Sequence, residues 1–317
     1  MKAILYTEYG SPDVLRLEDV PTPTPKQDEV LIRVRAASAN PLDWRVVRGS
    51  PYPIRVMVGL PKPRDPRLGV DVAGLVEAVG GNITQFQPGD EVFGSCSGAF
   101  AEYACASEKT LASKPAGVTF EQAASAVVGG VTALQALRDR GKLQRGQSVL
   151  INGAAGGVGT FAVQIAKWLG AEVTGVCSTR NVEMVRAIGA DRVVDYTRED
   201  FVRSGPYDLI LDMIGNRSLS ECRRALTRKG TLAVVGGRLR NMLAAPVVSP
   251  FVSQRLIPVM AKVKKEDLVT LRDLLEAGTV TPVIDRTYPL SGVSEAIRYL
   301  EEGHARGKVV IAMKDTE

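Results

Sequence analysis

The chain of 317 residues has few of the side chains that bind transition metals or form disulfide bonds. It has one histidine, His304, and four cysteines, with no C-x-x-C pair. Cys96 and Cys105 lie in the first 118 residues, where there is no histidine. Catalytic zinc usually takes three protein ligands from His, Cys and carboxylates, and structural zinc takes four. The sequence therefore predicts no metal site, and it predicts reduced thiols of the kind found in cytoplasmic proteins.

Aromatic residues are also scarce, at 5%, and they are not interleaved with basic runs, which disfavours nucleic-acid binding. The net charge is only +5. The densest basic cluster, at residues 262–265, is interpreted as part of a surface exposed to solvent. The longest apolar stretch, residues 242–260, is interrupted by prolines and is a poor candidate for a membrane span. The N-terminus lacks the apolar region of a signal peptide. We expect a cytoplasmic protein of two domains.

The pattern along the chain changes near residue 119. Before it, short strand patterns and turns dominate, as at residues 29–35, where apolar and charged residues alternate. After it, strand and helix patterns alternate, which argues for a parallel sheet with helices on both faces. Strand patterns return near the C-terminus. We predict an α/β protein in which a doubly wound domain, residues 119–284, is inserted into a β-rich domain made of residues 1–118 and 285–317.

The strongest chemical signal is the sequence Asn-Gly-Ala-Ala-Gly-Gly-Val-Gly at residues 152–159. It follows a strand pattern at 148–151 and opens a helical one. Glycines there permit a tight turn and a close approach to a pyrophosphate, and the helix N-terminus offers free N–H groups and partial positive charge. We therefore predict a dinucleotide site. Its phosphate-binding residues are Ala155, Gly156, Gly157 and Val158.

The residues after the next strand favour NADPH over NADH. NAD-binding domains hold the ribose 2′-hydroxyl with a carboxylate at that strand end, and this chain has Ser178 and Arg180 instead. Ser178 can donate to a 2′-phosphate, and Arg180 can pair with it. The phenol of Tyr196, after the following strand, can reach the same place. The alternatives are a solvated Arg180 and a Tyr196 that packs on the end of the sheet.

Seven stretches occur in an order and spacing typical of one family. They are Asn-Pro-Leu-Asp-Trp at 40–44, Gly-Val-Asp-Val-Ala-Gly at 69–74, Pro-Gly-Asp-Glu-Val-Phe at 88–93, Thr-Ala-Leu-Gln-Ala-Leu at 132–137, the glycine-rich turn at 153–159, Asp-Arg-Val-Val-Asp-Tyr at 191–196, and His-Ala-Arg-Gly-Lys at 304–308. Over nearly its whole length the chain resembles the medium-chain dehydrogenase/reductase superfamily. Within it, the resemblance is to the zinc-independent, zeta-crystallin-like quinone oxidoreductases, near the plastid envelope homologues and the mitochondrial reticulon-interacting oxidoreductases.

This resemblance implies a GroES-like catalytic domain and a Rossmann domain with the active site between them. It also implies NADPH as the cofactor, a small lipophilic enone or quinone as the substrate, and a homodimer. The zinc-dependent relatives carry cysteine and histidine ligands where this chain has residues 38–40 and Val70-Asp71. Ala155 stands where many relatives have serine. These departures agree with the shortage of ligands.

Hydride transfer to an enone or a quinone leaves an anionic oxygen, which preorganised donors stabilise. We predict Asn40 and Tyr52 as catalytic donors, because the resemblance places Asn40 beside the nicotinamide; proton delivery by solvent is equally open. Asp43 is a third candidate, although ordering its own loop suits it better, since a carboxylate repels a developing anion.

Four further residues are predicted to contact the cofactor. Gly236, at a strand's carboxyl end, holds the nicotinamide ribose by resemblance, and Arg306 and Lys308 reach the cofactor. Thr132 is expected to begin a helix, either as a ligand contact or as an N-cap.

Two apolar loops, residues 52–60 and 242–258, fit a lipophilic pocket, a dimer interface or core packing equally well. We therefore expect an NADPH-dependent, zinc-independent reductase of quinones or of activated C=C bonds. The alternatives are an enoyl-thioester reductase and a non-catalytic NADPH-binding protein.

Overall fold

The computed structural model describes residues 1–237 and 239–313. The chain forms two compact units. The first comprises Met1–Val128, Val263–Gly278 and the chain from Pro282 onward, and the second comprises Gly129–Lys262 and Thr279–Thr281. The boundary at Val128 falls within one helix, α3 (Phe120–Leu134).

The first unit is built on a seven-stranded sheet with the order β14-β15-β3-β4-β5-β7, in which β6 also pairs with β3. The strands are β3 (Glu29–Ala39), β4 (Asp71–Val79), β5 (Glu91–Ser95), β6 (Tyr103–Ser107), β7 (Leu111–Ser113), β14 (Ile284–Pro289) and β15 (Lys308–Ala312). Among the described strands of this sheet, β14 and β15 alone pair in parallel, and the other pairs are antiparallel. A separate hairpin joins β1 (Lys2–Leu5) to β2 (Arg16–Asp19). The β-rich character predicted from alternating residues is confirmed.

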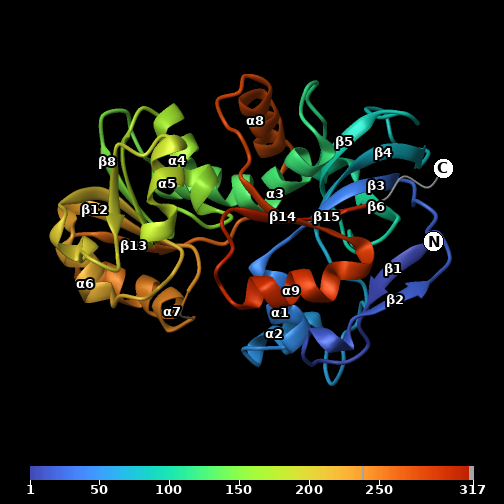
Figure 1. Ribbon diagram of the computed structural model, residues 1–317, viewed down its shortest axis with the longest axis horizontal. Helices are drawn as coiled ribbons and strands as arrows, with labels where there is room; N and C mark the ends of the chain where they lie inside the picture. The colour runs from blue at the N-terminus through green and yellow to red at the C-terminus, as the bar shows by residue number, and fades with distance from the viewer. Residues whose placement is uncertain (238, 314–317) are drawn as a thin grey trace. The chain divides into compact units, whose positions relative to one another are not determined.

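Four α-helices of the described chain lie wholly within this unit: α1 (Pro41–Arg48), α2 (Pro53–Val58), α8 (Lys265–Glu276) and α9 (Val293–Glu301). Helix α9 shows why the sequence folds as it does. Val293, Ala296, Ile297 and Leu300 recur at helical spacing, and all four are buried in the core. Figure 1 shows α9 beside α1, so this apolar stripe anchors the C-terminal segment to the N-terminal strands.

The second unit is a six-stranded parallel sheet with the order β10-β9-β8-β11-β12-β13. Its strands are β8 (Ser148–Asn152), β9 (Glu172–Cys177), β10 (Arg192–Asp195), β11 (Tyr207–Asp212), β12 (Leu226–Val234) and β13 (Arg255–Pro258), and its helices are α4 (Gly159–Trp168), α5 (Val182–Ala187), α6 (Leu219–Arg224) and α7 (Leu239–Val248). In Figure 1, α4 and α5 lie on one side of this sheet and α6 and α7 on the other. This is the strand order of the Rossmann fold. All strands run parallel, and the order in which they are added to the sheet reverses between β8 and β11, which is the switch point of the sheet.

Three details of the sequence-based interpretation were wrong. Thr132 does not begin a helix or cap one: it lies near the end of α3, because the run of small apolar residues before it continues the helix. The stretch 52–60 is not simply a loop, because it contains α2, which Pro53 opens from its first turn. The stretch 242–258 contains most of α7 and all of β13.

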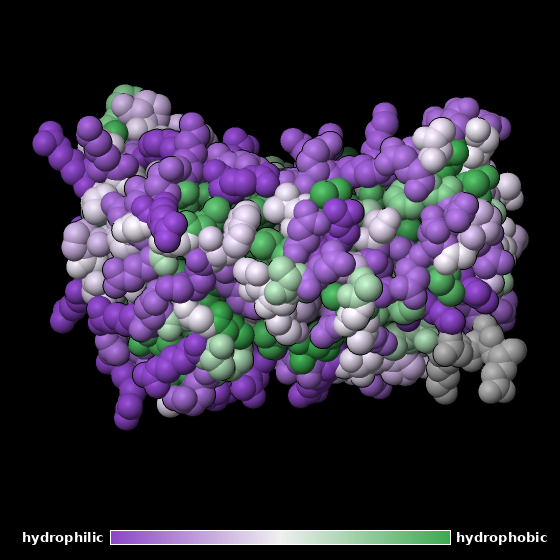
Figure 2. All heavy atoms as spheres, turned by 90° about the horizontal axis from the view of Figure 1, so that it is seen from above, coloured by the Kyte–Doolittle hydropathy of each residue, from purple (hydrophilic) through white to green (hydrophobic). Residues whose placement is uncertain are grey.

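The surface carries scattered apolar side chains. Figure 2 shows a face on which hydrophilic residues predominate and apolar ones gather in patches between them. Among the most exposed apolar residues are Met57 on α2, Val247 on α7 and Phe251 just after it. Within residues 1–237 and 239–313, no helix has the length and apolar character needed to cross a bilayer.

The turn between β8 and α4 depends on close backbone approach. Gly153 has φ +95°, and its carbonyl oxygen accepts a hydrogen bond from the N–H of Gly156 at 3.0 Å. A Cβ placed on Gly159 would stand 2.1 Å from that same oxygen. Because such a contact cannot exist, only glycine lets α4 begin this near the turn.

We predict that Gly159→Ala lowers the free energy of unfolding of the protein by about 1–3 kcal/mol, since the turn must shift to admit a methyl group. Gly156→Ala is the matched control, because its Cβ would meet only the Gly153 oxygen, at 3.4 Å. It should stay within about 1 kcal/mol of the wild type. Chemical denaturation of the purified variants measures both, and equal losses would contradict the packing argument.

Candidate functional site

A buried polar network fixes the carboxyl edge of the parallel sheet where the strand order reverses. Asn152 ends β8 and Asp212 ends the neighbouring β11. The Asn152 Nδ2 donates to Asp212 Oδ1 at 2.8 Å and to Asn216 Oδ1 at 3.0 Å. Asp212 Oδ1 also accepts the N–H groups of Ile214 and Gly215. These bonds hold two loops at the place where open α/β sheets bind their ligands.

The glycine-rich turn borders this network and presents backbone donors. In the described part of the chain, the N–H groups of Ala155, Gly157 and Val158 donate to no protein acceptor. The Thr160 hydroxyl, in the first turn of α4, is buried and likewise has no protein partner there. Unused N–H groups at the start of a helix are suited to an anion such as a pyrophosphate. The turn therefore fits the group predicted from its sequence.

Gly236 lies at the same edge, just after β12. A Cβ on Gly236 would stand 3.2 Å from the Met213 oxygen. Its neighbour Gly237 has φ +77°, and a Cβ there would stand 2.4 Å from the Ile214 oxygen. The segment that contains Gly236 thus packs closely on the loop that Asp212 holds, with backbone rather than side chains facing that loop.

The three residues predicted to recognise a 2′-phosphate follow two adjacent strands. Ser178 and Arg180 come directly after β9, and Tyr196 comes after β10, with its N–H donating to the Cys177 oxygen at 3.0 Å. The Tyr196 side chain is exposed. The structure therefore places the three residues at one edge of the sheet.

A carboxylate that the sequence interpretation passed over organises this edge. Asp195, the last residue of β10, accepts the Thr179 hydroxyl at 2.5 Å and both the N–H and the hydroxyl of Thr197, at 3.0 and 2.7 Å. These bonds, that of Thr179 foremost, hold the pKa of the Asp195 carboxyl below its ordinary value. The only signal in the sequence was its position at a strand end between two threonine-containing turns.

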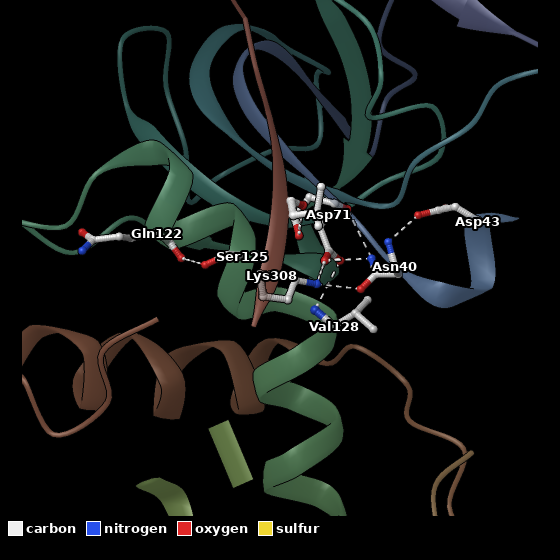
Figure 3. Close-up of polar contacts among 9 residues, drawn as sticks. Asn40, Asp43, Asp71, Gln122, Ser125, Val128 and Lys308 are labelled. Atoms are coloured by element: carbon white, nitrogen blue, oxygen red, sulfur yellow. Dashed lines mark hydrogen bonds and ion pairs between the residues drawn. The ribbon is translucent and has the colours of Figure 1, made fainter. Parts of the chain in front are cut away.

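The first unit contains a second cluster, made of Asn40, Asp71 and Lys308 (Figure 3). Asn40 follows β3, Asp71 opens β4 and Lys308 opens β15. The antiparallel register brings them together, because Ser38 pairs with Asp71 and Ala39 pairs with Val309. All three side chains are at most 4% exposed.

The contacts in this cluster are short and reciprocal. Lys308 Nζ donates to Asn40 Oδ1 at 2.7 Å and to Asp71 Oδ2 at 3.3 Å. Asn40 Nδ2 donates to Asp71 Oδ2 at 2.9 Å and to the Ser38 oxygen at 3.3 Å. Asp71 Oδ1 accepts the N–H of Val128 at 3.2 Å. Burial raises the pKa of Asp71, and the ammonium of Lys308 opposes that rise.

Asp43 adjoins this cluster as a helix cap. Its Oδ2 accepts the backbone N–H of Asn40 at 2.7 Å, which fixes the start of α1. This is the loop-ordering contact weighed for it from the sequence. The side chain is buried, and that burial, with the charge of Asp71 adding to it, raises the Asp43 pKa to about 7.

Within the described chain, three other predicted residues make no hydrogen bond to this cluster. Tyr52 precedes α2, with its ring exposed and 5.6 Å from the Arg55 guanidinium. Arg306 is exposed, and its backbone N–H donates to Asp285. Thr132 is buried within α3. The sequence analysis did not predict the hydrogen bond between Lys308 and Asn40. The one indication in the sequence was Asp71, a charged residue among the apolar residues of a strand.

The donor set of the cluster does not fit a metal ion, because an ammonium occupies its centre. Over the ranges that the structure describes, no group of three or more His, Cys, Asp and Glu side chains is arranged to hold one.

We predict that Asp43 makes stability fall as the pH rises. Its pKa is about 7 in the folded protein and 3.8 ordinarily, so the folded state binds the extra proton between these values. Its stabilising contribution is complete below about pH 4 and is lost as the pH rises through about 7. Asp43→Asn, whose amide oxygen can still accept the Asn40 N–H, should flatten this part of the curve.

Thermal unfolding of wild type and variant from pH 4 to pH 8 measures the effect. Asp90→Asn is the control, because Asp90 also accepts a backbone N–H, that of Gln87, but is partly exposed. Its curve should run parallel to that of the wild type. Parallel curves for Asp43→Asn would show that Asp43 does not titrate in this range.

Two family models match the chain. Residues 26–116 match the alcohol dehydrogenase GroES-like domain, and residues 188–311 match the zinc-binding dehydrogenase domain. The chain is 34% identical to the chloroplast envelope quinone oxidoreductase homolog of Arabidopsis thaliana, over 98% of both chains. It is 36% identical to the NADPH-dependent alkenal/one oxidoreductase, chloroplastic, of the same plant, over 98% of this chain and 79% of the other.

The fold agrees with these matches. The solved structure of the quinone oxidoreductase from Coxiella burnetii superposes with a TM-score of 0.90 at 33% identity, over 99% of both chains. The GroES-like and Rossmann domains predicted from the resemblance are thereby confirmed. The chain belongs to the medium-chain dehydrogenase/reductase superfamily and, within it, to the family of the quinone oxidoreductases.

Proposed function

We propose that this protein is an NADPH-dependent reductase that transfers a hydride to a quinone or to the activated C=C bond of an α,β-unsaturated carbonyl compound, without zinc. The observation that carries the proposal is the glycine-rich turn beside the switch point of the sheet, whose N–H groups at Ala155, Gly157 and Val158 donate to no acceptor among residues 1–237 and 239–313. The names of the two Arabidopsis relatives, a quinone oxidoreductase homolog and an alkenal/one oxidoreductase, support this choice of acceptors.

The second unit supplies the residues that would hold the cofactor. Residues 155–158 take the pyrophosphate, with Gly156 giving the backbone room to approach. Gly236 takes the nicotinamide ribose. Ser178, Arg180 and Tyr196 take the 2′-phosphate, through a hydroxyl, a guanidinium and a phenol at adjacent strand ends. Thr132 and Arg306 stay predicted contacts. Bound NADPH supplies the hydride.

The first unit supplies the polar groups for the acceptor. Reduction of a conjugated carbonyl leaves negative charge on its oxygen, and fixed donors in a dry site stabilise that charge. The cluster of Asn40, Asp71 and Lys308 is dry, fixed and contains a cation. Because this cation is an ammonium, stabilisation comes from a hydrogen bond rather than from a zinc ion. Asp43 holds the Asn40 backbone, and Tyr52 stays a candidate donor.

The remaining expectations concern assembly and location. We keep the homodimer as a proposal; β13 ends the parallel sheet with one edge that no described strand pairs. We also keep a cytoplasmic location as a proposal from the reduced state expected of the four cysteines, all of which are free thiols.

The first prediction of this proposal is NADPH consumption with alkenals, enones or quinones that persists after exhaustive chelation. The absorbance of NADPH is followed against these acceptors and against enoyl thioesters, with and without chelator. Loss of activity on chelation with recovery on added zinc would overturn zinc independence. Faster turnover of enoyl thioesters would favour the alternative reductase. NADPH binding without oxidation by any acceptor would favour a non-catalytic binding protein.

The second prediction concerns the choice of cofactor. Arg180→Asp removes the cation proposed to pair with the 2′-phosphate and adds a carboxylate able to bind a 2′-hydroxyl. Since hydrogen bonds to charged groups contribute roughly 1.5–3 kcal/mol, the ratio of kcat/KM for NADPH over NADH should fall about 10- to 100-fold.

Arg186→Asp is the matched control, because it makes the same change of charge on the exposed side of α5, where Arg186 pairs with Glu183. Its ratio should change less than about threefold, since the charge of this exposed, already paired side chain is screened by water and salt. An unchanged ratio in Arg180→Asp would remove Arg180 from the cofactor site.

A further inference from the structure

The Asn40 amide has no hydrogen left to offer a substrate. A side-chain amide carries two N–H groups. One points to Asp71 Oδ2 and the other to the Ser38 oxygen. The amide oxygen is also engaged, by Lys308. To donate to a carbonyl oxygen of a substrate, Asn40 would first have to break a buried hydrogen bond, which costs about 1–3 kcal/mol.

The ammonium of Lys308, in contrast, has a hydrogen to spare. It carries three N–H groups. Two acceptors lie near it, Asn40 Oδ1 at 2.7 Å and Asp71 Oδ2 at 3.3 Å. No third acceptor contacts it in the described part of the chain. It is thus the one member of the cluster able to donate to an incoming oxygen while keeping its present partners.

The burial of this cation is costly for stability alone. The Lys308 and Asp71 side chains are 3% and 0% exposed. Taking two charges out of water costs several kcal/mol for each ion, and apolar replacements of such pairs are often neutral or stabilising. Because a buried ion pair of this kind contributes little net free energy to folding, its presence points to a role in chemistry.

The cluster stands where the ends of three strands meet. It gathers the end of β3 and the starts of β4 and β15, and the Val128 N–H bonded to Asp71 belongs to the last residue before the chain leaves the unit (Figure 3). Ends of strands and the loops they carry are where folds place reactive groups on a rigid support.

We propose that Lys308, and not Asn40, is the catalytic donor: its ammonium hydrogen-bonds the carbonyl oxygen of the acceptor and gives that oxygen a proton. Asn40 and Asp71 are positioning residues that aim the ammonium. The inference rests on the proposed reductase function and replaces the cofactor contact expected for Lys308.

With an enone, the β-carbon receives the hydride and its electron pair from NADPH, which is thereby oxidised to NADP⁺. The C=C pair shifts to form the enolate, the Nζ–H bond of Lys308 breaks, and an O–H bond forms on the substrate. The enol then rearranges to the saturated ketone, and Lys308 recovers its proton from solvent. A quinone takes the hydride on oxygen or carbon and the same proton to give the hydroquinone.

The test is Lys308→Met, measured with an enone and NADPH. We expect kcat to fall about 100- to 1,000-fold, as for loss of one donor to a developing oxyanion, while the Kd for NADPH changes less than about threefold. Asn40→Ala should lower kcat less than Lys308→Met does. A normal kcat with a raised Kd for NADPH would return Lys308 to the cofactor site and overturn the inference.

Two further variants separate chemistry from folding. Lys308→Met leaves Asp71 buried without its cation, so the double variant Asp71→Asn/Lys308→Met removes both charges; it should fold with a kcat as low as that of the single variant. Lys114→Met is the matched control, because Lys114 is another buried lysine of the same unit, 6% exposed and paired with Glu91. It should lose stability while keeping kcat.

The outcomes distinguish this inference from the proposed function. If the wild type reduces no enone or quinone, both fail together. If the wild type is active and the folded double variant keeps its kcat, only the role of Lys308 fails. The solvent deuterium isotope effect on kcat gives a further test. The same effect in the wild type and in both variants would also overturn proton donation by Lys308.

Discussion

The ion pair between Lys308 and Asp71 is the constraint on which the first unit depends. It joins the starts of β15 and β4, and through Asn40 it also holds the end of β3. Because both charges are buried, removing either one leaves the other unpaired at a cost of about 3–5 kcal/mol. The pair therefore fixes how three segments from distant parts of the sequence meet. The site is rigid because the fold cannot relax it without exposing a charge to an apolar core.

In the second unit, strand ends and the loops that follow them are also fixed by buried polar side chains, but without a buried ion pair of this kind among its described residues. Asn152 and Asp212 end adjacent parallel strands, and their hydrogen bond fixes the loops that follow. Asp195 does the same for the loops after β9 and β10. In each case a carboxylate at a strand end accepts hydrogen bonds both from the loop that follows it and from a residue at the end of the neighbouring strand or just after it. The loops are thus held by bonds made inside the protein, so that the backbone groups proposed to bind the cofactor need not be reorganised on binding.

The sequence predicted the parts of this arrangement that depend on local patterns. Strand and helix periodicity located α9 and β8, and the glycine-rich turn was recognisable because tight backbone approach leaves so few choices of residue. The cluster around Lys308 was not predictable in the same way. Its members are joined by register, and Lys308 and Asp71 are 237 positions apart in the chain. The position of Thr132 was misread, because the helix already begins at Phe120, where Thr119 and Gln122 cap it with reciprocal hydrogen bonds.

An ammonium and a metal ion both polarise a carbonyl oxygen, but only the ammonium carries a proton to give. A lysine beside a carboxylate therefore suits a reaction that ends with hydrogen on the substrate, such as reduction of an enone. The same pair explains how the donor is renewed. Once Lys308 has lost its proton, the charge of Asp71 is left in a buried site with no cation beside it. That state is unfavourable, and taking a proton from solvent relieves it. Asp71 thus has two effects: it aims the ammonium before the step, and it drives the ammonium to form again afterwards.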